Sequence, residues 1–214
     1  MSKLILFQGD SITDSGRNYE STIFEGYGYV TMVKGILGLD YPEKYTFMNK
    51  GISANRIVDV YARIKRDIIN LSPDYMSILI GVNDVWHEFN NKNGVATPKF
   101  EKIYSMLIEE IKEALPNIKI MILEPFVLKG SSTASNDNYE DLYPLFRAEV
   151  EEKAKAAKRI AEKYSLPFVS LQEKFDEVYN PDFPDYWVRD GVHPTAAGHM
   201  LIAREWVKAF DKIN

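Results

Sequence analysis

Three side chains in polar, glycine-containing segments have the types that nucleophilic catalysis requires. Ser11 lies in Gly9-Asp10-Ser11-Ile12, and Asp190 and His193 stand three residues apart in Asp190-Gly191-Val192-His193-Pro194. A serine hydroxyl is a weak nucleophile until a base takes its proton, and histidine does this near neutral pH. The short spacing lets the Asp190 carboxylate hold the far nitrogen of the same imidazole. These residues predict ester cleavage, with Ser11 as nucleophile, His193 as base and Asp190 as the group that orients His193.

Such a reaction also needs hydrogen-bond donors for the negative oxygen that forms on the ester carbonyl. Asn83, in Gly81-Val82-Asn83-Asp84, offers a side-chain amide. The small residues of Asn49-Lys50-Gly51-Ile52-Ser53-Ala54-Asn55 let the backbone approach a ligand closely. We therefore expect backbone N–H groups after the first and second strands to form an oxyanion hole with Asn83.

Short apolar runs separated by longer amphipathic ones must position these side chains. Helices are predicted over 98–115 with Thr97 as N-cap, over about 145–164, and after Thr195. The alternation of the two patterns predicts an α/β fold, a three-layer α/β/α sandwich with a parallel sheet of about five strands. Ligands bind at the carboxyl ends of the strands in such folds, where the polar segments stand. The predicted strands, apolar on both faces, are 4–7, 45–48, 76–80, 118–123 and 168–169.

Length, charge and composition exclude several classes of protein. The 214 residues suit one domain, and their net charge of −5, without a clustered basic stretch, argues against nucleic-acid binding. There is no cysteine, and the three histidines form no H-E-x-x-H motif, so we expect no metal and no cofactor. No apolar run is long enough for a membrane span or a signal-peptide core, which predicts a cytoplasmic protein that binds no membrane.

Two histidines and two glycine-containing strings lie outside this set. His87 follows Trp86 and either occupies a surface loop or lines the cleft, and both interpretations stay open. His199 lies on the last predicted helix beside small residues, and we interpret it as structural. The string that begins at Gly51 lacks the final glycine of a G-x-S-x-G elbow, and Gly26-Tyr27-Gly28 lacks the third glycine of a dinucleotide fingerprint.

Taken together, the polar segments resemble the four blocks of the SGNH (GDSL) hydrolases. The string His193-Pro194-Thr195-Ala196-Ala197-Gly198-His199-Met200 and the residues around the first three blocks resemble the bacterial acetylxylan esterase branch more closely. The resemblance spans nearly the whole chain. Its four blocks are Gly9 to Ile12, Gly51 to Asn55, Gly81 to Asp84 and Asp190 to Pro194.

This resemblance implies a flavodoxin-like fold, a single hydrolase domain over 1–214 and an acyl-enzyme mechanism. It implies an oxyanion hole made of the backbone N–H groups of Ser11 and Ala54 and the side-chain amide of Asn83. The family usually has glycine at the position of Ala54. Alanine keeps the N–H, but a positive φ at this position would strain it.

The branch-level resemblance further implies removal of small acyl groups, chiefly acetyl, from carbohydrate esters such as acetylated xylo-oligosaccharides. Aromatic faces near a cleft suit sugar rings. We therefore expect Trp86 and Trp187 to contact a small-molecule carbohydrate ester, beside Asp10 and Gly51. The resemblance leaves self-association open, because members of the family are often oligomeric.

Other functions also stay open at this point. A lysophospholipase or thioesterase of the same family would need a long apolar channel for the acyl chain. A doubly wound domain with Asp10 at a strand end also suits a receiver-like or flavin-binding module, in which Asp190 and His193 have no role. A pseudo-enzyme that retains sugar binding is the third alternative.

Overall fold

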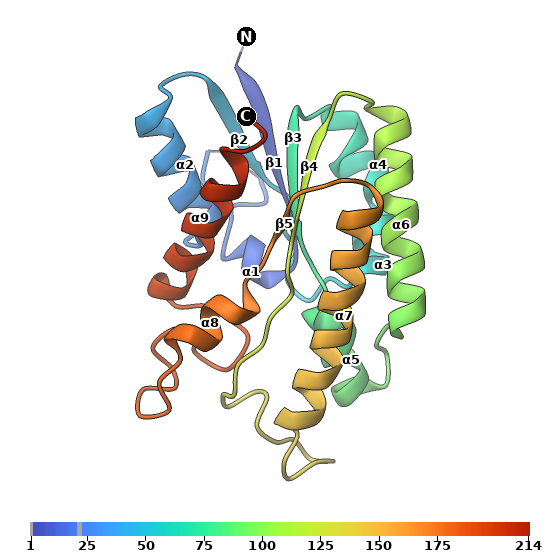
Figure 1. Cartoon of the computed structure of the whole chain (residues 1–214), viewed down its shortest axis with the longest axis vertical. Coiled ribbons are helices and arrows are strands. Elements are labelled where there is room, and N and C mark those ends of the chain that lie inside the picture. Colours follow the sequence, from blue (N-terminus) through green and yellow to red (C-terminus); the bar gives the residue numbers. More distant parts are fainter. Residues whose placement is uncertain (1, 21–22) are drawn as a thin grey trace.

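A central parallel sheet organises the described part of the chain. The computed structural model describes residues 2–20 and 23–214, and within them five strands follow the order β2-β1-β3-β4-β5 (Figure 1). Every neighbouring pair is parallel, so the carboxyl ends of the strands lie along one edge. This order is that of flavodoxin-like sheets. The strands are β1 (Lys3–Gly9), β2 (Tyr45–Asn49), β3 (Tyr75–Leu79), β4 (Lys119–Leu123) and β5 (Phe168–Val169).

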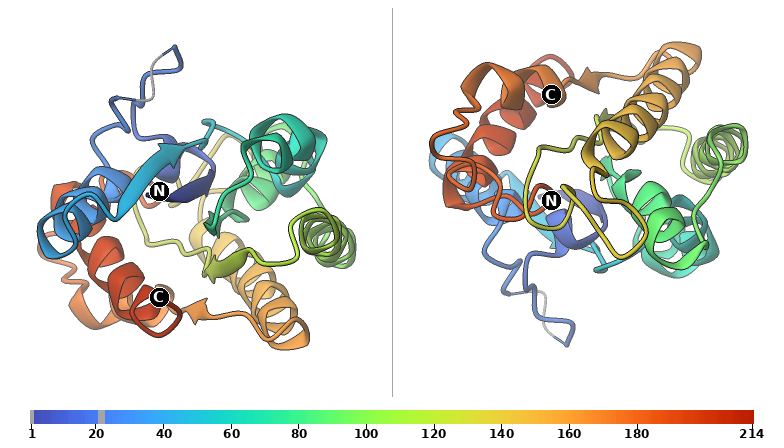
Figure 2. Two further views of the ribbon diagram at one scale, coloured as in Figure 1. Left: turned by 90° about the horizontal axis from the view of Figure 1, so that it is seen from above. Right: turned by 90° about the horizontal axis from the view of Figure 1, so that it is seen from below.

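Helices connect the strands and cover both faces of the sheet. They are α1 (Ser11–Asp14), α2 (Tyr29–Asp40), α3 (Ile57–Ala62), α4 (Ile64–Asp67), α5 (Val82–Asn91), α6 (Thr97–Ala114), α7 (Tyr143–Lys163), α8 (Gln172–Val178) and α9 (Ala196–Phe210), with a 3-10 turn over Ile69–Leu71. Figure 2 shows α2 and α9 on one side of the sheet and α3, α4 and α6 on the other. This is the three-layer α/β/α sandwich predicted from the sequence.

Two apolar cores fill the spaces between these layers. Ile5 and Phe7 of β1 face the core that α2 and α9 cover, whereas Leu6 faces the core under α3, α4 and α6. Successive side chains of a strand point to opposite faces, so a strand that is buried on both sides must be apolar throughout. Burial on both faces therefore explains why the strands read as continuous apolar runs.

Most predicted elements form near their predicted positions, with one error at the start of a helix. The helix expected over 98–115 is α6, and the one expected over about 145–164 is α7. Thr97 is not an N-cap. Ala96 holds that position without a side-chain hydrogen bond, and Thr97 Oγ1 instead accepts a hydrogen bond from Lys153 Nζ at 2.7 Å. The prediction is wrong because a buried lysine of α7 takes up the hydroxyl that was expected to cap α6.

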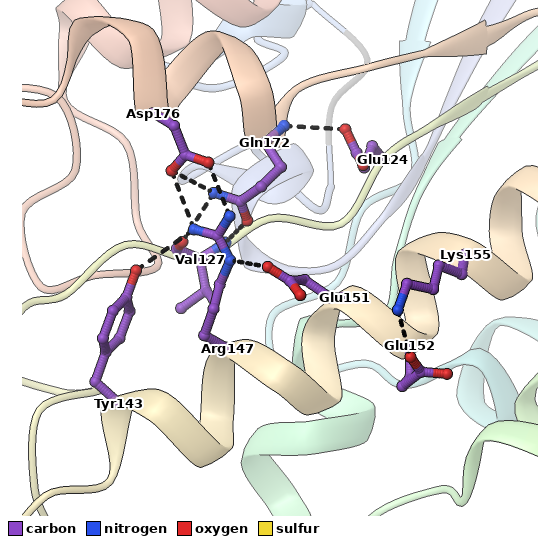
Figure 3. A network of polar contacts seen from close by, with 9 residues as sticks. All are labelled: Glu124, Val127, Tyr143, Arg147, Glu151, Glu152, Lys155, Gln172 and Asp176. Atoms are coloured by element: carbon purple, nitrogen blue, oxygen red, sulfur yellow. Dashed lines mark hydrogen bonds and ion pairs between the residues drawn. The ribbon is translucent and has the colours of Figure 1, made fainter.

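Polar contacts join α8 to α7 and to the segment that follows β4 (Figure 3). Gln172 pairs with Val127 as a peptide group would, because Val127 N–H donates to Gln172 Oε1 at 3.0 Å and Gln172 Nε2 donates to Val127 O at 3.1 Å. Arg147 of α7 donates to both carboxylate oxygens of Asp176, at 3.0 and 2.8 Å. These contacts fix the position of the chain after β4.

Residues 2–20 and 23–214 contain neither a metal-binding cluster nor a membrane-spanning helix. No group of His, Asp and Glu side chains in these ranges is arranged to hold a metal ion. No helix in them combines the length and apolar character that crossing a membrane requires.

Candidate active site

Ser11 is positioned by the end of β1 and the first turn of α1. Because β1 lies between β2 and β3, the residues after it stand in the interior of the carboxyl edge (Figure 1). Asp10 caps α1, since its Oδ1 accepts the N–H of Ile12 at 3.0 Å. This cap turns the chain from strand to helix at Ser11, the first residue of α1, and leaves the Ser11 side chain partly exposed.

The loop before α9 presents Asp190 and His193 together. Gly191 between them has φ +97°, a left-handed conformation that favours glycine. The N–H of Arg189 donates to the carbonyl of His193 at 2.9 Å and closes the loop. Thr195 caps α9 with its hydroxyl immediately afterwards. The backbone of this short loop therefore holds the Asp190 carboxylate next to the His193 imidazole.

Ser11, His193 and Asp190 form one chain of hydrogen bonds. Ser11 Oγ lies 2.9 Å from His193 Nε2, and His193 Nδ1 lies 2.7 Å from Asp190 Oδ2. An ionised carboxylate only accepts hydrogen bonds, so Nδ1 carries the ring proton and donates it to Asp190. Nε2 is then left with a lone pair, and the Ser11 hydroxyl donates to it. This is the geometry in which histidine takes the serine proton as the oxygen attacks.

Backbone and ring donors keep Asp190 charged. Its Oδ1 accepts the N–H of Val192 at 3.0 Å and the N–H of His193 at 2.8 Å, while Oδ2 faces the imidazole. Burial alone would raise the pKa of Asp190. The hydrogen bonds from the His193 ring and from the two N–H groups outweigh burial and hold this pKa well below its usual range. The carboxylate is therefore available near neutral pH to stabilise an imidazolium.

The segment after β2 packs closely on α1. Asn49 Nδ2 donates to the carbonyl of Thr13 at 2.6 Å, and Asn49 Oδ1 accepts the N–H of Gly51 at 2.9 Å. A Cβ at Gly51 would collide with the backbone of Thr13 and Asp14, so glycine permits the close approach. Asp14 in turn accepts the N–H of Ser53 at 3.1 Å. These contacts bring the Gly51–Asn55 block beside the residue that follows β1.

Three hydrogen-bond donors, on Ser11 in α1, on Ala54 after β2 and on Asn83 in α5, are candidates for an oxyanion hole. Asn83 Nδ2 donates one hydrogen to the carbonyl of Asn55 at 3.2 Å, and its second hydrogen is left for a ligand. The N–H of Ser11 begins α1 and has no partner within that helix. Ala54 has φ +65°, the left-handed conformation that glycine adopts without strain. Its N–H makes no hydrogen bond to another described residue.

A cleft of about 650 Å³ lies beside Ser11 and His193. Several of its residues were not singled out from the sequence, notably Arg189 and Tyr27. They stand in irregular loops, where no periodic pattern marks a side chain as functional. For Arg189, direct adjacency to Asp190 was the one available signal. The cleft is lined by Ser11, Ile12, Ser15, Gly16, Tyr27, Ser53, Arg189, His193, Pro194, Thr195, Ala196 and His199.

His199 lines this cleft from the first turn of α9 as a neutral ring. The residue is 6% exposed, and its Nδ1 accepts the N–H of Tyr29 at 3.1 Å. Its Nε2 therefore carries the proton and faces Ser15 Oγ at 3.4 Å. Burial, reinforced by the positive charge of Arg189, lowers the pKa of His199 to about 4. His199 thus connects α9 to the start of α2 and adds no charge to the cleft near neutral pH.

The two tryptophans expected at the substrate site lie in different places. The Trp86 ring centroid is 6.0 Å from that of His193, so Trp86 stands beside the histidine. Trp187 instead lines a separate hollow of about 440 Å³ with residues of α8 and α9, among them Met200 and Arg204. The structure therefore brings Trp86, and not Trp187, next to the Ser11–His193 pair.

Asp10, Gly51 and His87 are not among the residues that line this cleft. Asp10 is 1% exposed, its Oδ2 has no partner among the described residues, and burial raises its pKa to about 7. Gly51 is buried under α1, and His87 lies partly exposed on α5 rather than in a loop. Direct contact of Asp10 or Gly51 with a substrate stays a prediction.

Comparison with known proteins decides the family. The model of the GDSL-like lipase/acylhydrolase family matches residues 7–201, which include Ser11, Asp190 and His193. The chain belongs to this family. Its resemblance to the SGNH (GDSL) hydrolases is thereby confirmed, and it is a carboxylic ester hydrolase.

Named relatives and solved structures of the GDSL-like family match almost the entire chain. An acetylxylan esterase of Geobacillus stearothermophilus is 36% identical over 223 residues, which cover 96% of each chain. A crystal structure of that esterase has a TM-score of 0.83 at 34% identity and covers 97% of this chain and 93% of its own. A protein of Parabacteroides merdae described as a GDSL-like lipase has a TM-score of 0.84 at 33% identity, covering 99% and 97%. The fold and the family therefore agree.

Proposed function

We propose that this acylhydrolase removes acetyl groups from carbohydrate esters, and that acetylated xylo-oligosaccharides are its substrate class. The observation that carries the chemistry is the hydrogen-bonded chain from Ser11 through His193 to Asp190 beside an accessible cleft. The substrate class is supported by 36% identity to an acetylxylan esterase over 96% of the chain. Solved structures of the Geobacillus esterase described as catalytic mutants replace a serine, a histidine or an aspartate by alanine, the residue types proposed here.

Acylation begins when Ser11 Oγ attacks the carbonyl carbon of the ester. Its proton moves to His193 Nε2, and the carbonyl electrons shift onto the oxygen, which becomes an oxyanion. The N–H groups of Ser11 and Ala54 and the amide of Asn83 donate to that oxygen. The oxyanion collapses, the bond to the sugar oxygen breaks, and the sugar leaves with the proton from His193. Acetyl-Ser11 remains, while Asp190 stabilises the imidazolium between the two proton transfers.

Water completes the reaction by hydrolysing acetyl-Ser11. Water is now the nucleophile, and Ser11 is the leaving group. His193 takes a proton from a water molecule as the water oxygen attacks acetyl-Ser11. The second oxyanion forms in the same donor set and collapses. Acetic acid leaves, and Ser11 recovers its proton from His193. No group beyond the residues of this chain, the ester and water is needed for the balance of atoms and charge.

Several groups in the cleft can form hydrogen bonds with a hydroxylated alcohol. Hydroxyl, imidazole and guanidinium groups make up much of its lining, from Ser15, Ser53, Arg189, Thr195 and His199. A lysophospholipase or thioesterase needs an apolar channel that buries a long acyl chain. These hydrogen-bonding groups therefore support acetyl sugars as the substrate class, and the chain-length series below decides between the two alternatives.

A chain-length series tests the proposal. We expect p-nitrophenyl acetate to be cleaved with a higher kcat/KM than the octanoate, and acetylated xylo-oligosaccharides to release acetate. Ser11→Ala should lower kcat by several orders of magnitude, because the nucleophile is lost. Ser105→Ala, a change on α6 far along the chain from the site, is the control and should turn over normally.

Each other outcome points to a specific alternative. A preference for octanoate would favour the lysophospholipase or thioesterase interpretation. Hydrolysis that survives Ser11→Ala would remove Ser11 as nucleophile, and a folded chain inactive on all of these esters would favour the binding-module alternative. The cytoplasmic location and single-domain organisation expected from the sequence stay predictions, and self-association stays open.

A further inference from the structure

The cleft beside Ser11 carries one permanent positive charge and no carboxylate. Among its lining residues within the described part of the chain, Arg189 is the one lysine or arginine, and no aspartate or glutamate is present. Asp190 stays charged, but its two oxygens accept hydrogen bonds from the backbone and from His193, so it forms no ion pair with Arg189. A protein of net charge −5 thus places a cation that forms no ion pair in the lining of the cleft beside Ser11.

The guanidinium of Arg189 has no partner within residues 2–20 and 23–214. No hydrogen bond, ion pair or aromatic contact of its side chain is formed there, and the residue is exposed. Arg204 on α9 shares this condition but lies outside the cleft, in the hollow of Trp187. Six other arginines donate to carboxylate or carbonyl oxygens: Arg17, Arg56, Arg63, Arg66, Arg147 and Arg159. Arg189 is therefore a free donor at the one place where a substrate must bind.

The backbone of Arg189 is held at a constant distance from the reacting groups. Its N–H donates to the carbonyl of His193, and its neighbour Val188 forms an antiparallel bridge with Pro194. The side chain can move, but these two contacts hold the Arg189 backbone beside His193. His199, which also lines the cleft, stays neutral near pH 7, so it neither repels nor replaces the guanidinium.

We propose that Arg189 is a specificity-determining residue that binds a carboxylate on the alcohol part of the ester. The inference rests on the proposed function. An acetyl group carries no ionisable group, so a carboxylate on the substrate must belong to the sugar. Guanidinium pairs with carboxylate through two parallel N–H···O bonds, which also orients the ligand. The preferred substrates are acetyl esters of acidic saccharides, those that carry a uronic acid near the acetylated hydroxyl.

A pair of acetyl esters that differ in one charge tests this specificity. We would measure kcat/KM for 4-acetoxybenzoate and for its neutral methyl ester, and compare the ratio of the two between variants. For Arg189→Gln we expect the anionic-to-neutral ratio to fall about fivefold, as for an exposed ion pair. Arg189→Lys should retain part of the preference, since lysine keeps the positive charge but cannot form two parallel N–H···O bonds with a carboxylate. In 0.5 M NaCl the wild-type ratio should approach that of Arg189→Gln.

Arg204→Gln is the matched control, because it removes an equally exposed and unpaired arginine outside the cleft. Its anionic-to-neutral ratio should stay within twofold of wild type. An equal fall in both variants would mean a general effect of net charge and would overturn the role of Arg189. A ratio in Arg189→Gln within twofold of wild type would overturn it as well, while hydrolysis of the methyl ester would leave the proposed function standing.

A binding measurement separates this inference from the failure of the proposed function. Titration calorimetry with benzoate and with benzamide requires no turnover. Wild type should bind benzoate more tightly than benzamide, and Arg189→Gln should lose that difference while Arg204→Gln keeps it. If the chain cleaves neither ester, this comparison still decides whether Arg189 binds a carboxylate, and equal affinity of wild type for both probes would refute it.

Discussion

At the scale of single residues, proton placement in the active site is governed by Asp190. Its Oδ1 is occupied by two backbone N–H groups, so only Oδ2 is left to face the imidazole. This arrangement makes Nδ1 of His193 a donor and Nε2 an acceptor toward Ser11. The loop backbone therefore selects the tautomer that the proposed mechanism requires, and the geometry at Ser11 depends on a charge two hydrogen bonds away.

Asp190→Asn should disable the proposed reaction while preserving the fold. The asparagine Oδ1 still accepts the N–H groups of Val192 and His193, which turns its Nδ2 donor toward the ring. His193 then carries its proton on Nε2 and no longer accepts from Ser11. We expect kcat on p-nitrophenyl acetate to fall by roughly 10²–10⁴. Asp185→Asn, on the exposed segment before this loop, is the control. Equal turnover in both variants would contradict the assignment of Asp190.

Ala54 offers a test on stability. Its φ of +65° is strained for a residue with a Cβ, and its N–H is kept by any substitution except proline. Ala54→Gly should raise the free energy of unfolding by roughly 1 kcal/mol in urea melts. Ala114→Gly, at an exposed helical position on α6, should change it in the opposite direction by ~0.5–1 kcal/mol. Destabilisation by both changes would show that the left-handed backbone at Ala54 carries no strain.

Single residues were predictable where they sit in recognisable blocks and not elsewhere. Ser11, Asp190 and His193 could be grouped because each stands at a strand end or before a helix, among residues with matching chemistry. Trp187 was expected in the cleft because it precedes Asp190 closely, yet proximity along the chain does not fix side-chain direction, and its indole lies in the hollow at α8 and α9. Arg189 was missed because an exposed loop arginine has no pattern of its own.

At the scale of elements, the chain after β4 supports the loop that carries Asp190 and His193. We call residues 127–133 the buttress segment. The N–H of Leu128 donates to the carbonyl of Gly191 at 2.9 Å, and the N–H of Ser132 donates to the carbonyl of Asp190 at 3.0 Å. The same segment is tied to α8 through Gln172 (Figure 3). Helix α8 therefore contributes to the position of Asp190 without touching the cleft.

Gln172→Ala should loosen this support. It leaves the N–H and carbonyl of Val127 without the amide that satisfies both, in a buried environment. The free energy of unfolding should fall by about 1–3 kcal/mol in urea melts. Glu173→Ala, the exposed neighbour on α8, should change it by no more than ~0.5 kcal/mol. Similar values for the two variants would show that the Gln172–Val127 pair does not stabilise the buttress segment.

Strands were easier to predict than the ends of helices, and the reason is physical. A parallel strand covered on both faces must be apolar throughout, so its sequence reveals it directly, and 168–169 is found with the predicted bounds. A helix start depends on which partner a hydroxyl finds. Thr97 could cap α6 as judged from its own neighbours, but the buried Lys153, 56 positions later, donates a hydrogen bond to that hydroxyl. Such a contact is invisible until the helices are packed.

At the scale of the whole molecule, the sheet brings together groups that are 182 positions apart. Ser11 follows β1, which lies in the interior of the sheet. His193 precedes α9, which packs on the face of the sheet to which Ile5 and Phe7 of β1 point. The parallel direction of all strands implies that loops meet at one edge, and this much follows from the pattern of apolar runs. The 2.9 Å distance does not, because it depends on how α9 packs on α2 and on the Tyr29–His199 contact between them.

That contact also makes the stability of the molecule depend on pH. The pKa of His199 is about 4 in the folded chain because of burial, against 6.5 for the unperturbed residue. Between these values the unfolded chain binds a proton that the folded chain does not, so stability rises with pH across this window and falls on acidification. The difference corresponds to about 3 kcal/mol. Asp10 works in the opposite direction, since its pKa of about 7 makes the folded chain hold the extra proton below neutrality.

Substitution isolates the two contributions. His199→Gln retains an acceptor for the N–H of Tyr29 and cannot titrate, so the variant should lose the acid sensitivity of that ring. From pH 7 to pH 4, wild type should lose about 3 kcal/mol of unfolding free energy relative to His199→Gln in urea melts. Asp10→Asn should show the opposite effect. The unfolding free energy of wild type should rise relative to that of this variant as the pH falls. Parallel pH curves for wild type and His199→Gln would mean that the imidazole is protonated equally in both states, and the packing of α9 on α2 would then owe nothing to a neutral His199.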